Sequence, residues 1–316
     1  MKNCAFVIAA ASLTPFCGHG QNINTVLSDW SIVTSGNLQS VNDYDGNAYV
    51  GGNVTDANGF TVNAIGGAAG SVSLDVAGNL SSGNSGNIIK VNGYGNVGVG
   101  GSLNGRTFDF NNGGHESSSL PASPVQALTA ASGTLAGLTA NSQASLSSDH
   151  QTFNFNCTAG DSVAVFNVSA SDMSSAPQFG LSGVTANTTV VINVNCNDGT
   201  LNVKGNFLSS FNLGSLGNRV VFNFYNAQNV NLNTGIYGYV LAPGANVDEV
   251  NDIYGGVFCN NLTAGEVDLP PGSQTVWQGN LSSVPEPATW LSGAALVGLL
   301  GVSFIRRKAG NGGAAQ

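Results

Sequence analysis

The chain has 316 residues, of which 42% are hydrophobic and only 8% are charged, against about 25% charged residues in an ordinary soluble domain. Its 44 glycines and abundant asparagines favour strands joined by tight turns, which excludes a helical bundle. Between residues 21 and 284 there are four basic and sixteen acidic residues, so the net charge of −12 excludes electrostatic binding of nucleic acid.

Residues 1–20 predict a signal peptide. Lys2 supplies the positive start, residues 5–13 are the apolar stretch, and Gly18 to Gly20 offer small residues of the kind that signal peptidase prefers. A buried first strand or helix is the alternative interpretation. Export through signal peptidase would place the rest of the chain in an oxidising compartment.

The body, residues 21–281, contains strand-and-turn units at 47–54, 74–80 and 97–103. In each unit apolar residues alternate with small or polar ones, which is the period of a half-buried strand. The glycines Gly52, Gly78 and Gly101 lie 26 and 23 residues apart. Spacings of this size are typical of a β-solenoid, in which each coil must stack on its neighbours to bury its inner face.

A second repeat lies near the end of the body. Residues 236–242 are echoed by residues 253–259, with an offset of 17 residues and a turn signal at 243–246 between them. Further strands are predicted at residues 162–168, 189–194, 201–203 and 220–225.

One helix is predicted between these repeats. Ser123 is its expected N-cap, Pro124 its first residue and Gln126 the second half of a capping box. Its apolar residues, which fall near one helical face, are Val125, Leu128, Leu135 and Leu138. We expect this helix to pack along the flank of the β-structure; a loose linker rich in serine, threonine and alanine is the alternative.

The C-terminal end combines three features. Pro285, Glu286 and Pro287 lie in a linker at 282–289, an uncharged stretch follows at 290–305, and a basic tail, 306–316, begins with Arg306 and Arg307. A sixteen-residue helix is about 24 Å long, slightly short for a hydrocarbon core of about 30 Å, and terminal Trp and Arg side chains can extend it. We expect a transmembrane helix with a cytoplasmic tail and the body across the membrane.

This ordered triplet resembles the PEP-CTERM sorting signal over about the last thirty residues. The resemblance implies recognition of Pro285-Glu286-Pro287 and Arg306-Arg307 by an exosortase, a membrane-embedded protease that cleaves near the tripeptide. It also implies a Gram-negative host that makes exopolysaccharide. A plain single-span anchor is the alternative.

The body resembles the choice-of-anchor A family. The matching segments are residues 27–34, 45–53, 166–169, 189–194, 221–223, 239–245, 255–257 and 277–281. The resemblance implies a surface or matrix module with a role in adhesion and no general catalytic set. Cys259 stands where a small residue is more typical of the family.

Residues that carry chemistry are sparse in the body. His115 and His150 are its only histidines, and Cys157, Cys196 and Cys259 form no close pair, so neither a zinc site nor a serine triad is predicted. Both histidines are expected in exposed turns, and no cofactor is expected.

The cysteines and acids leave alternatives open. Cys196 and Cys259 are disulfide candidates, and small buried residues are the other interpretation. Asp43 with Asp45, and Asp248 with Glu249 and Asp252, are calcium candidates, but neither group matches a calcium loop, so solvated turns are favoured.

The sequence therefore predicts one mainly β, solenoid-like domain with one flanking α-helix, followed by a C-terminal transmembrane helix. The expected role is a non-catalytic protein of the cell envelope, outer surface or matrix, acting in adhesion or biofilm assembly, with exopolysaccharide or surface proteins as partners. A secreted polysaccharide lyase or hydrolase is the first alternative, which a cleft gathering acids with Arg106 or Arg219 would support. Ice binding is the second, although Thr61, Thr188 and Thr189 form no regular row.

Overall fold

The structure is a computed structural model that describes residues 22–40, 43–55, 61–63, 72–81, 88–93, 95–111, 113–117, 119–211, 214–264, 266–269 and 277–281. The expected signal peptide, Pro-Glu-Pro motif, transmembrane helix and basic tail lie outside these residues. Within them, no helix has both the length and the apolar character of a membrane span.

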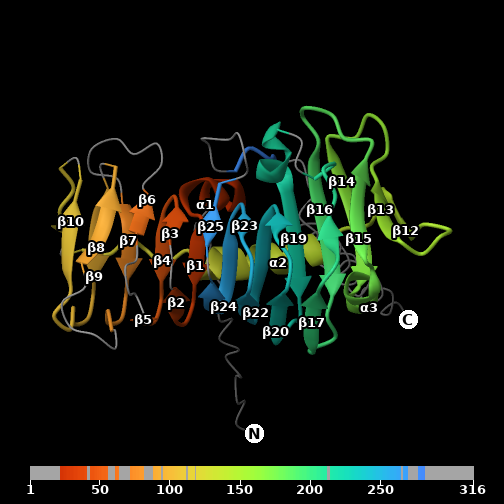
Figure 1. Ribbon diagram of the computed structural model, residues 1–316. Helices are drawn as coiled ribbons and strands as arrows, with labels where there is room; N and C mark the ends of the chain where they lie inside the picture. Colours follow the sequence, from red (N-terminus) through yellow and green to blue (C-terminus); the bar gives the residue numbers. More distant parts are fainter. Residues whose placement is uncertain are drawn as a thin grey trace, which may run out of the picture.

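The chain is mainly β, with parallel sheets and few helices (Figure 1). Every strand pair described is parallel except β12 with β13. The largest sheet runs in the order β11 (Glu116–Ser117), β9 (Asn96–Val99), β7 (Val72–Val76), β4 (Ala48–Val50), β1 (Ile32–Thr34), β24 (Val257–Ala264), β22 (Tyr239–Glu249), β19 (Val220–Tyr225), β16 (Thr189–Asn195) and β14 (Val163–Ser169). A second ladder branches from the long strands β22 and β24 and adds β20 (Asn229–Leu232), β17 (Thr200–Val203), β2 (Leu38–Ser40) and β5 (Val54–Thr55).

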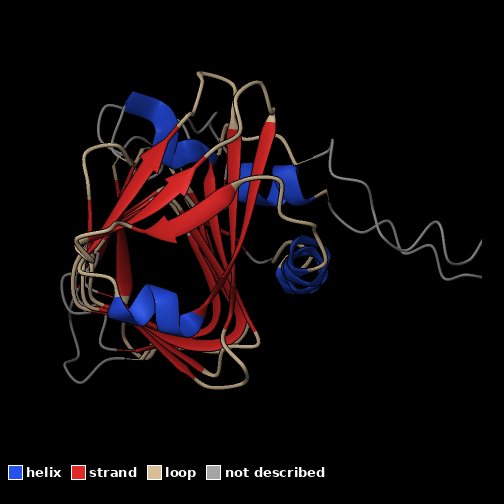
Figure 2. Cartoon of the chain, turned by 90° about the vertical axis from the view of Figure 1, so that its right-hand side faces the viewer, coloured by secondary structure: helices blue, strands red, loops and turns tan. Residues whose placement is uncertain are grey.

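Two smaller sheets complete the strand layers. The first has the order β10 (Thr107–Phe110), β8 (Ile88–Asn92), β6 (Thr61–Asn63), β3 (Asp43–Asp45), β25 (Val267–Asp268), β23 (Ile253–Tyr254) and β21 (Ile236–Tyr237). The second has the order β12 (Gln143–Leu146), β13 (Thr152–Asn156), β15 (Gln178–Ser182) and β18 (Asn206–Phe207). Seen along the row of strands, the sheets surround a common interior (Figure 2).

The described chain begins in the middle of the row and not at an end. From β1 it proceeds through β4, β7 and β9 to one end, and it resumes with β12 and β13 at the other end (Figure 1). It then returns through β14, β16, β19 and β22 to β24, which pairs with β1. In the largest sheet, the first strand in chain order, β1, and the last, β24, are therefore neighbours.

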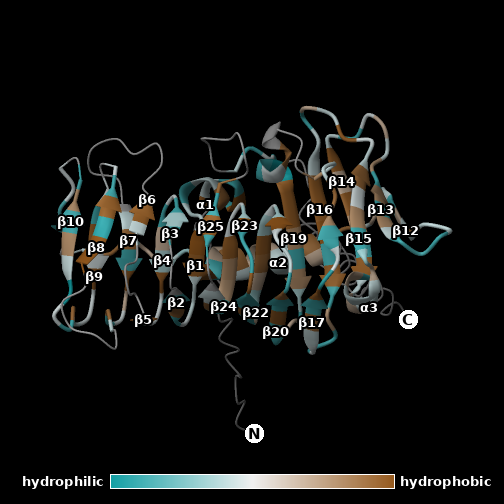
Figure 3. Cartoon of the chain, in the orientation of Figure 1, coloured by the Kyte–Doolittle hydropathy of each residue, from teal (hydrophilic) through white to brown (hydrophobic). Residues whose placement is uncertain are grey.

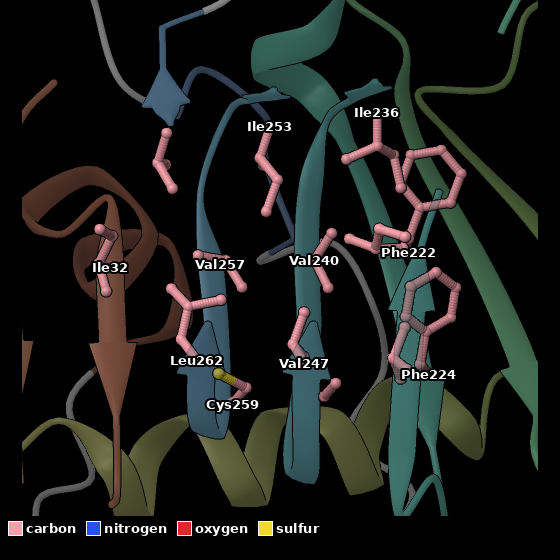
Figure 4. Close-up of a cluster of buried hydrophobic side chains, with 14 of the residues drawn as sticks. Ile32, Phe222, Phe224, Ile236, Val240, Val247, Ile253, Val257, Cys259 and Leu262 are labelled. Carbon is pink, nitrogen blue, oxygen red and sulfur yellow. The ribbon is translucent and has the colours of Figure 1, made fainter. Parts of the chain in front are cut away.

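The interior is filled by the inward side chains of all these strands. Val, Ile, Leu and Phe alternate with outward polar residues, and Figure 3 shows the hydrophobic residues along the strands and the more hydrophilic ones at the turns. Ile32, Val240 and Val257 point into the same space from three adjacent strands (Figure 4). Burying each such side chain contributes about 1.5–3 kcal/mol.

Both repeats seen in the sequence stack as neighbouring strands. Ala48 of β4 pairs with Leu74 of β7, which pairs with Val97 of β9. Ile236 pairs with Ile253, and Val240 with Val257, so the 17-residue offset separates residues that lie side by side. The strands expected at 162–168, 189–194, 201–203 and 220–225 are present as β14, β16, β17 and β19.

The turn expected at residues 243–246 is wrong. These residues lie inside β22, where the pairing with β24 shifts register between Ala242 and Asn246. Ala245 is fully buried there, so the irregularity redirects the strand from one ladder to the next without ending it.

The predicted helix is confirmed as α2 (Val125–Ala136), which lies along the outside of the sheet and is seen end-on in Figure 2. Leu128 and Leu135 bury against Val191 and Val221. The predicted cap is wrong in position: Pro124 and not Ser123 is the N-cap, although Ser123 Oγ accepts a hydrogen bond from the Val125 N–H at 3.4 Å.

The expectation of a single helix is also wrong. The described part also has α1 (Ile23–Asp29), α3 (Ala170–Ser175) and the 3-10 helix η1 (Gly214–Arg219). Ser169 and Asp172 form a capping box at α3, a signal that the sequence carried and that the strand periodicity around it obscured.

Candidate functional site

The outer surface of the second ladder carries polar residues that repeat from strand to strand. In β20, Val230 and Leu232 point into the core, while Asn229 and Asn231 point outward. The same alternation in the neighbouring strands repeats polar residues at equivalent positions. They form two parallel rows along the molecule, because parallel strands in register keep equivalent side chains side by side. The second row contains Asn202, Asn231, Asp248 and Thr263.

We call the first of these the asparagine row. It runs from Thr200 through Asn229, Asn246, Asn261, Asn37, Asn53 and Asn79 to Ser102. In its C-terminal half, side chains bond to one another: Asn261 Nδ2 donates to Asn246 Oδ1 at 2.8 Å, and Asn246 Nδ2 donates to Asn229 Oδ1 at 3.3 Å.

The N-terminal half of the row is built differently. Each side-chain oxygen accepts from the backbone N–H of the next strand-and-turn unit: Asn37 Oδ1 from Asn53 at 2.8 Å, and Asn53 Oδ1 from Asn79 at 2.8 Å. The oxygens are therefore used internally. Within the described residues the Nδ2 donors of Asn37, Asn53 and Asn79 have no partner, so they face solvent as a row of free amide donors.

A shallow open groove of about 520 Å³ lies over β17, β20, β22 and β24, beside this row. Its lining residues are Thr200, Asn229, Asn231, Asn246, Val247, Asp248, Asn261 and Thr263. Amides and hydroxyls dominate the lining, and Asp248 is its one carboxylate. Such a surface can exchange hydrogen bonds with hydroxyl or carbonyl groups, but it offers no acid–base pair for catalysis.

The fold separates some of the acidic residues that are close in the sequence and brings others together. Asp248 faces outward into the groove, whereas its neighbour Glu249 is buried. Asp252 instead lies near Asp43 and Asp45, together with Glu266 and Asp268, on the surface of the sheet that contains β3, β23 and β25. Burial and these neighbouring carboxylates raise the pKa of Asp268 to about 6.

Two tyrosines adjoin this acidic patch. The rings of Tyr237 and Tyr254 stack with centroids 4.8 Å apart, and the Tyr254 hydroxyl donates to Asp252 Oδ2 at 2.8 Å. Among the described residues, no group of three or more His, Cys, Asp or Glu side chains has an arrangement that could hold a metal ion. The calcium candidates Asp248, Glu249 and Asp252 are thus not brought together.

The cysteines are small buried residues, which is the second of the two interpretations that the sequence left open. Cys157, Cys196 and Cys259 are free and buried, so the structure contains no Cys196–Cys259 disulfide. Cys259 lies in β24 between Thr34 and Ala242 and points into the core, as Figure 4 shows. Burial raises the pKa of the Cys157 and Cys196 thiols to about 11, which keeps both protonated and unreactive at neutral pH.

Both histidines are exposed, as expected. His150 follows β12 in a turn with a left-handed φ of 57°, and His115 lies between β10 and β11. Neither shares a hydrogen bond with a serine or a carboxylate in the described part, apart from the backbone bond of His150 to Ser147.

Comparison with known families identifies the body. A family model described as "Putative Ice-binding-like adhesive domain" matches residues 23–269. The chain belongs to this family. The match spans the groove, the asparagine row and α2, and it lies within the body that the sequence delimits at 21–281. Comparisons with curated proteins and with solved structures found no match.

The sequence did not indicate the asparagine row. Its central bond joins Asn261 to Asn37, which are 224 residues apart, and only the pairing of β24 with β2 brings them together. A usable signal was present in the first half, where an asparagine follows each of the aligned glycines Gly52 and Gly78.

Proposed function

We propose that the protein is a surface adhesin that attaches through the asparagine row and the adjoining groove. The observation that carries this proposal is the row itself, in which aligned amides extend across both halves of the chain. Membership in an adhesive-domain family supports the same conclusion.

The chemistry of the row suits a repetitive ligand rich in hydroxyl groups. Neighbouring strands lie about 4.8 Å apart, so the outward amides of Asn37, Asn53 and Asn79 repeat at roughly that spacing. The side-chain oxygen of each of these asparagines already accepts a backbone hydrogen bond. The row therefore presents its Nδ2 donors to acceptor groups of a ligand. Many weak contacts of this kind would add up along a polysaccharide or a protein surface.

We further propose that the protein is non-catalytic and reaches the outer surface or matrix of a Gram-negative cell. The choice-of-anchor A and PEP-CTERM resemblances support this, with signal peptidase and exosortase as processing partners. Deletion of residues 285–308 should release or mislocalise the protein, and unchanged envelope retention would contradict the sorting proposal.

The adhesion proposal can be tested with matched double variants of the full chain. Asn246→Ala with Thr263→Ala alters the groove, and Asn111→Ala with Thr107→Ala alters an exposed threonine of β10 and the exposed asparagine just after that strand, away from the groove. We expect the first to reduce retention on immobilised polysaccharides or cell-surface protein at least tenfold, and the second to leave it within twofold.

The controls are thermal unfolding curves, because loss of adhesion must not reflect loss of fold. Both double variants change exposed residues and should lower the unfolding free energy by about 1 kcal/mol or less. Equal retention of the two double variants would remove the groove from the proposal.

Ice binding is a second candidate, favoured by the family description and by the parallel rows of polar residues on the second ladder. The rows contain more asparagine than threonine, which favours adhesion. Thermal hysteresis and ice recrystallisation assays on the same variants distinguish the two: ice activity lost only in the groove variant would select ice as the ligand.

A further inference from the structure

A second depression, apart from the groove, lies where four segments of the chain meet. It has a volume of about 440 Å³ and is lined by Ser162, Ala186, Asn187, Arg219, Gln278 and Asn280. Ser162 precedes β14, Ala186 and Asn187 precede β16, and Arg219 ends η1. Gln278 and Asn280 belong to the segment 277–281. No acidic residue lines it.

Arg219 stands out at this depression. It is only 8% exposed, whereas the other five lining residues are exposed. Its Nε has no hydrogen-bond partner, and its guanidinium forms no ion pair with any described residue. Burial lowers the pKa of Arg219, but an arginine remains charged at any physiological pH.

A buried, uncompensated guanidinium is costly for the folded state. It is one of four basic residues in an acidic body, and the fold gives it no carboxylate. This cost would be offset when an anion enters the depression from outside.

The walls around Arg219 are fixed before any ligand arrives. Gln278 N–H donates to the Asn218 carbonyl at 2.9 Å, and Asn280 N–H donates to Thr189 Oγ1 at 2.8 Å. The segment 277–281 is thereby tied to η1 and to β16. A preorganised wall lowers the entropy cost of binding.

We propose that this depression binds the carboxylate of an acidic sugar, of the uronate type. The guanidinium offers a planar fork that matches a carboxylate with two parallel hydrogen bonds. The hydroxyl of Ser162 and the amides of Asn187, Gln278 and Asn280 suit the sugar hydroxyls. The volume falls in the range of small-ligand sites and accommodates about one sugar ring.

The lining also defines what the site does not do. Because Arg219 has no acidic neighbour in the lining, the depression lacks the pair of carboxylates that glycoside hydrolysis needs. It is a binding site, independent of the groove in position and in charge, so it stands even if the groove proposal fails.

Titration of the full chain with sodium glucuronate, followed by calorimetry or NMR, tests the proposal. We expect glucuronate to bind and glucose, which lacks the carboxylate, to bind at least tenfold more weakly. Arg219→Met should weaken glucuronate binding at least tenfold, and Arg219→Lys should give an intermediate loss, because lysine keeps the charge without the fork. Lys204→Met, which removes one exposed positive charge elsewhere, should change binding less than twofold.

Several outcomes would overturn the proposal. They are equal binding of glucose and glucuronate, unchanged binding by Arg219→Met, or tighter binding of the carboxylate of acetyl-Ala-Ala, which would assign the site to peptides. If Arg219→Met does not fold, Asn187→Ala at the exposed rim replaces it, with a loss of at least threefold expected and no loss contradicting the proposal.

Discussion

At the scale of single residues, the repeat glycines show how the sequence encodes stacking. Gly78 N–H donates to the Gly52 carbonyl, and Gly101 N–H donates to the Gly78 carbonyl, each at 2.9 Å. A Cβ on Gly78 would lie 2.5 Å from the Gly52 oxygen, closer than any real Cβ contact. Glycine is therefore required where successive units approach one another, which explains why the 26- and 23-residue spacings could be read directly from the sequence.

A buried carboxylate gives a prediction at the same scale. Asp75 in β7 is 1% exposed, lies against Gly98, and neither of its oxygens has a hydrogen-bond partner in the described part. Burial raises its pKa to about 7. In the unfolded chain this pKa is about 3.9, so between roughly pH 4 and pH 7 the folded state binds more protons and the unfolding free energy falls as the pH rises.

Asp75→Asn should remove the destabilisation that the buried, ionised carboxylate causes at high pH. At pH 8 we expect the variant to be more stable than the original chain by up to about 4 kcal/mol, because the folded pKa lies about 3 units above the unfolded one, and at pH 4 the difference should nearly vanish. Denaturant unfolding at a series of pH values measures this, with the exposed Asp109→Asn as the control. A difference that does not depend on pH would show that Asp75 is not the titrating group.

At the scale of elements, α2 is held by side-chain hydrogen bonds as well as by apolar packing. Asn167, Asn193 and Asn223, on three adjacent strands, donate to the carbonyls of Leu138, Leu135 and Ser132 at 2.9, 2.6 and 3.0 Å. Leu135 lies in the last turn, where carbonyls lack partners further along the helix, whereas Ser132 lies one turn before the end of α2 and Leu138 just beyond it. The outer face of the strands thus recognises the C-terminal end of α2.

These bonds predict unequal effects of two similar substitutions. Asn193 is 1% exposed and also bonds Asn167 and Asn223, so Asn193→Ala should cost about 2–3 kcal/mol by leaving buried polar groups unpaired. Asn167 is exposed, so Asn167→Ala should cost about 1 kcal/mol or less. Chemical denaturation compares them, and equal costs would mean that α2 depends on its apolar face alone.

At the scale of the whole molecule, local signals were predictable and long-range closure was not. Alternating strands, stacked repeats and the α2 helix follow from periodicities within about 30 residues. Three features depend on contacts between residues more than 50 positions apart in the sequence. They are the pairing of β1 with β24, the asparagine row that crosses this pairing, and the depression around Arg219. In a single sequence, neither the spacing of residues nor the composition indicates which distant strands become neighbours.

This closure makes the two halves of the chain energetically dependent on one another. Leu262 in β24 is 1% exposed and is paired with Leu38 of β2 on one side and Val247 of β22 on the other. Leu262→Ala should cost about 2–5 kcal/mol, whereas Ala at the neighbouring exposed Thr263 should cost less than about 0.5 kcal/mol. Because β24 is the only strand that bridges β2 and β22 in the described part, the loss should reach both halves.

Hydrogen exchange with peptide resolution measures how far the loss spreads. In Leu262→Ala, amides of β4 and β7 from the N-terminal half should exchange faster by about the same factor as those of β16 and β19 from the C-terminal half. In a stack whose units interact only with their nearest neighbours, the effect would instead fade with distance from β24. Faster exchange confined to strands adjoining β24 would therefore show that the halves unfold independently. In that case β24 would join the two halves without making them one cooperative unit.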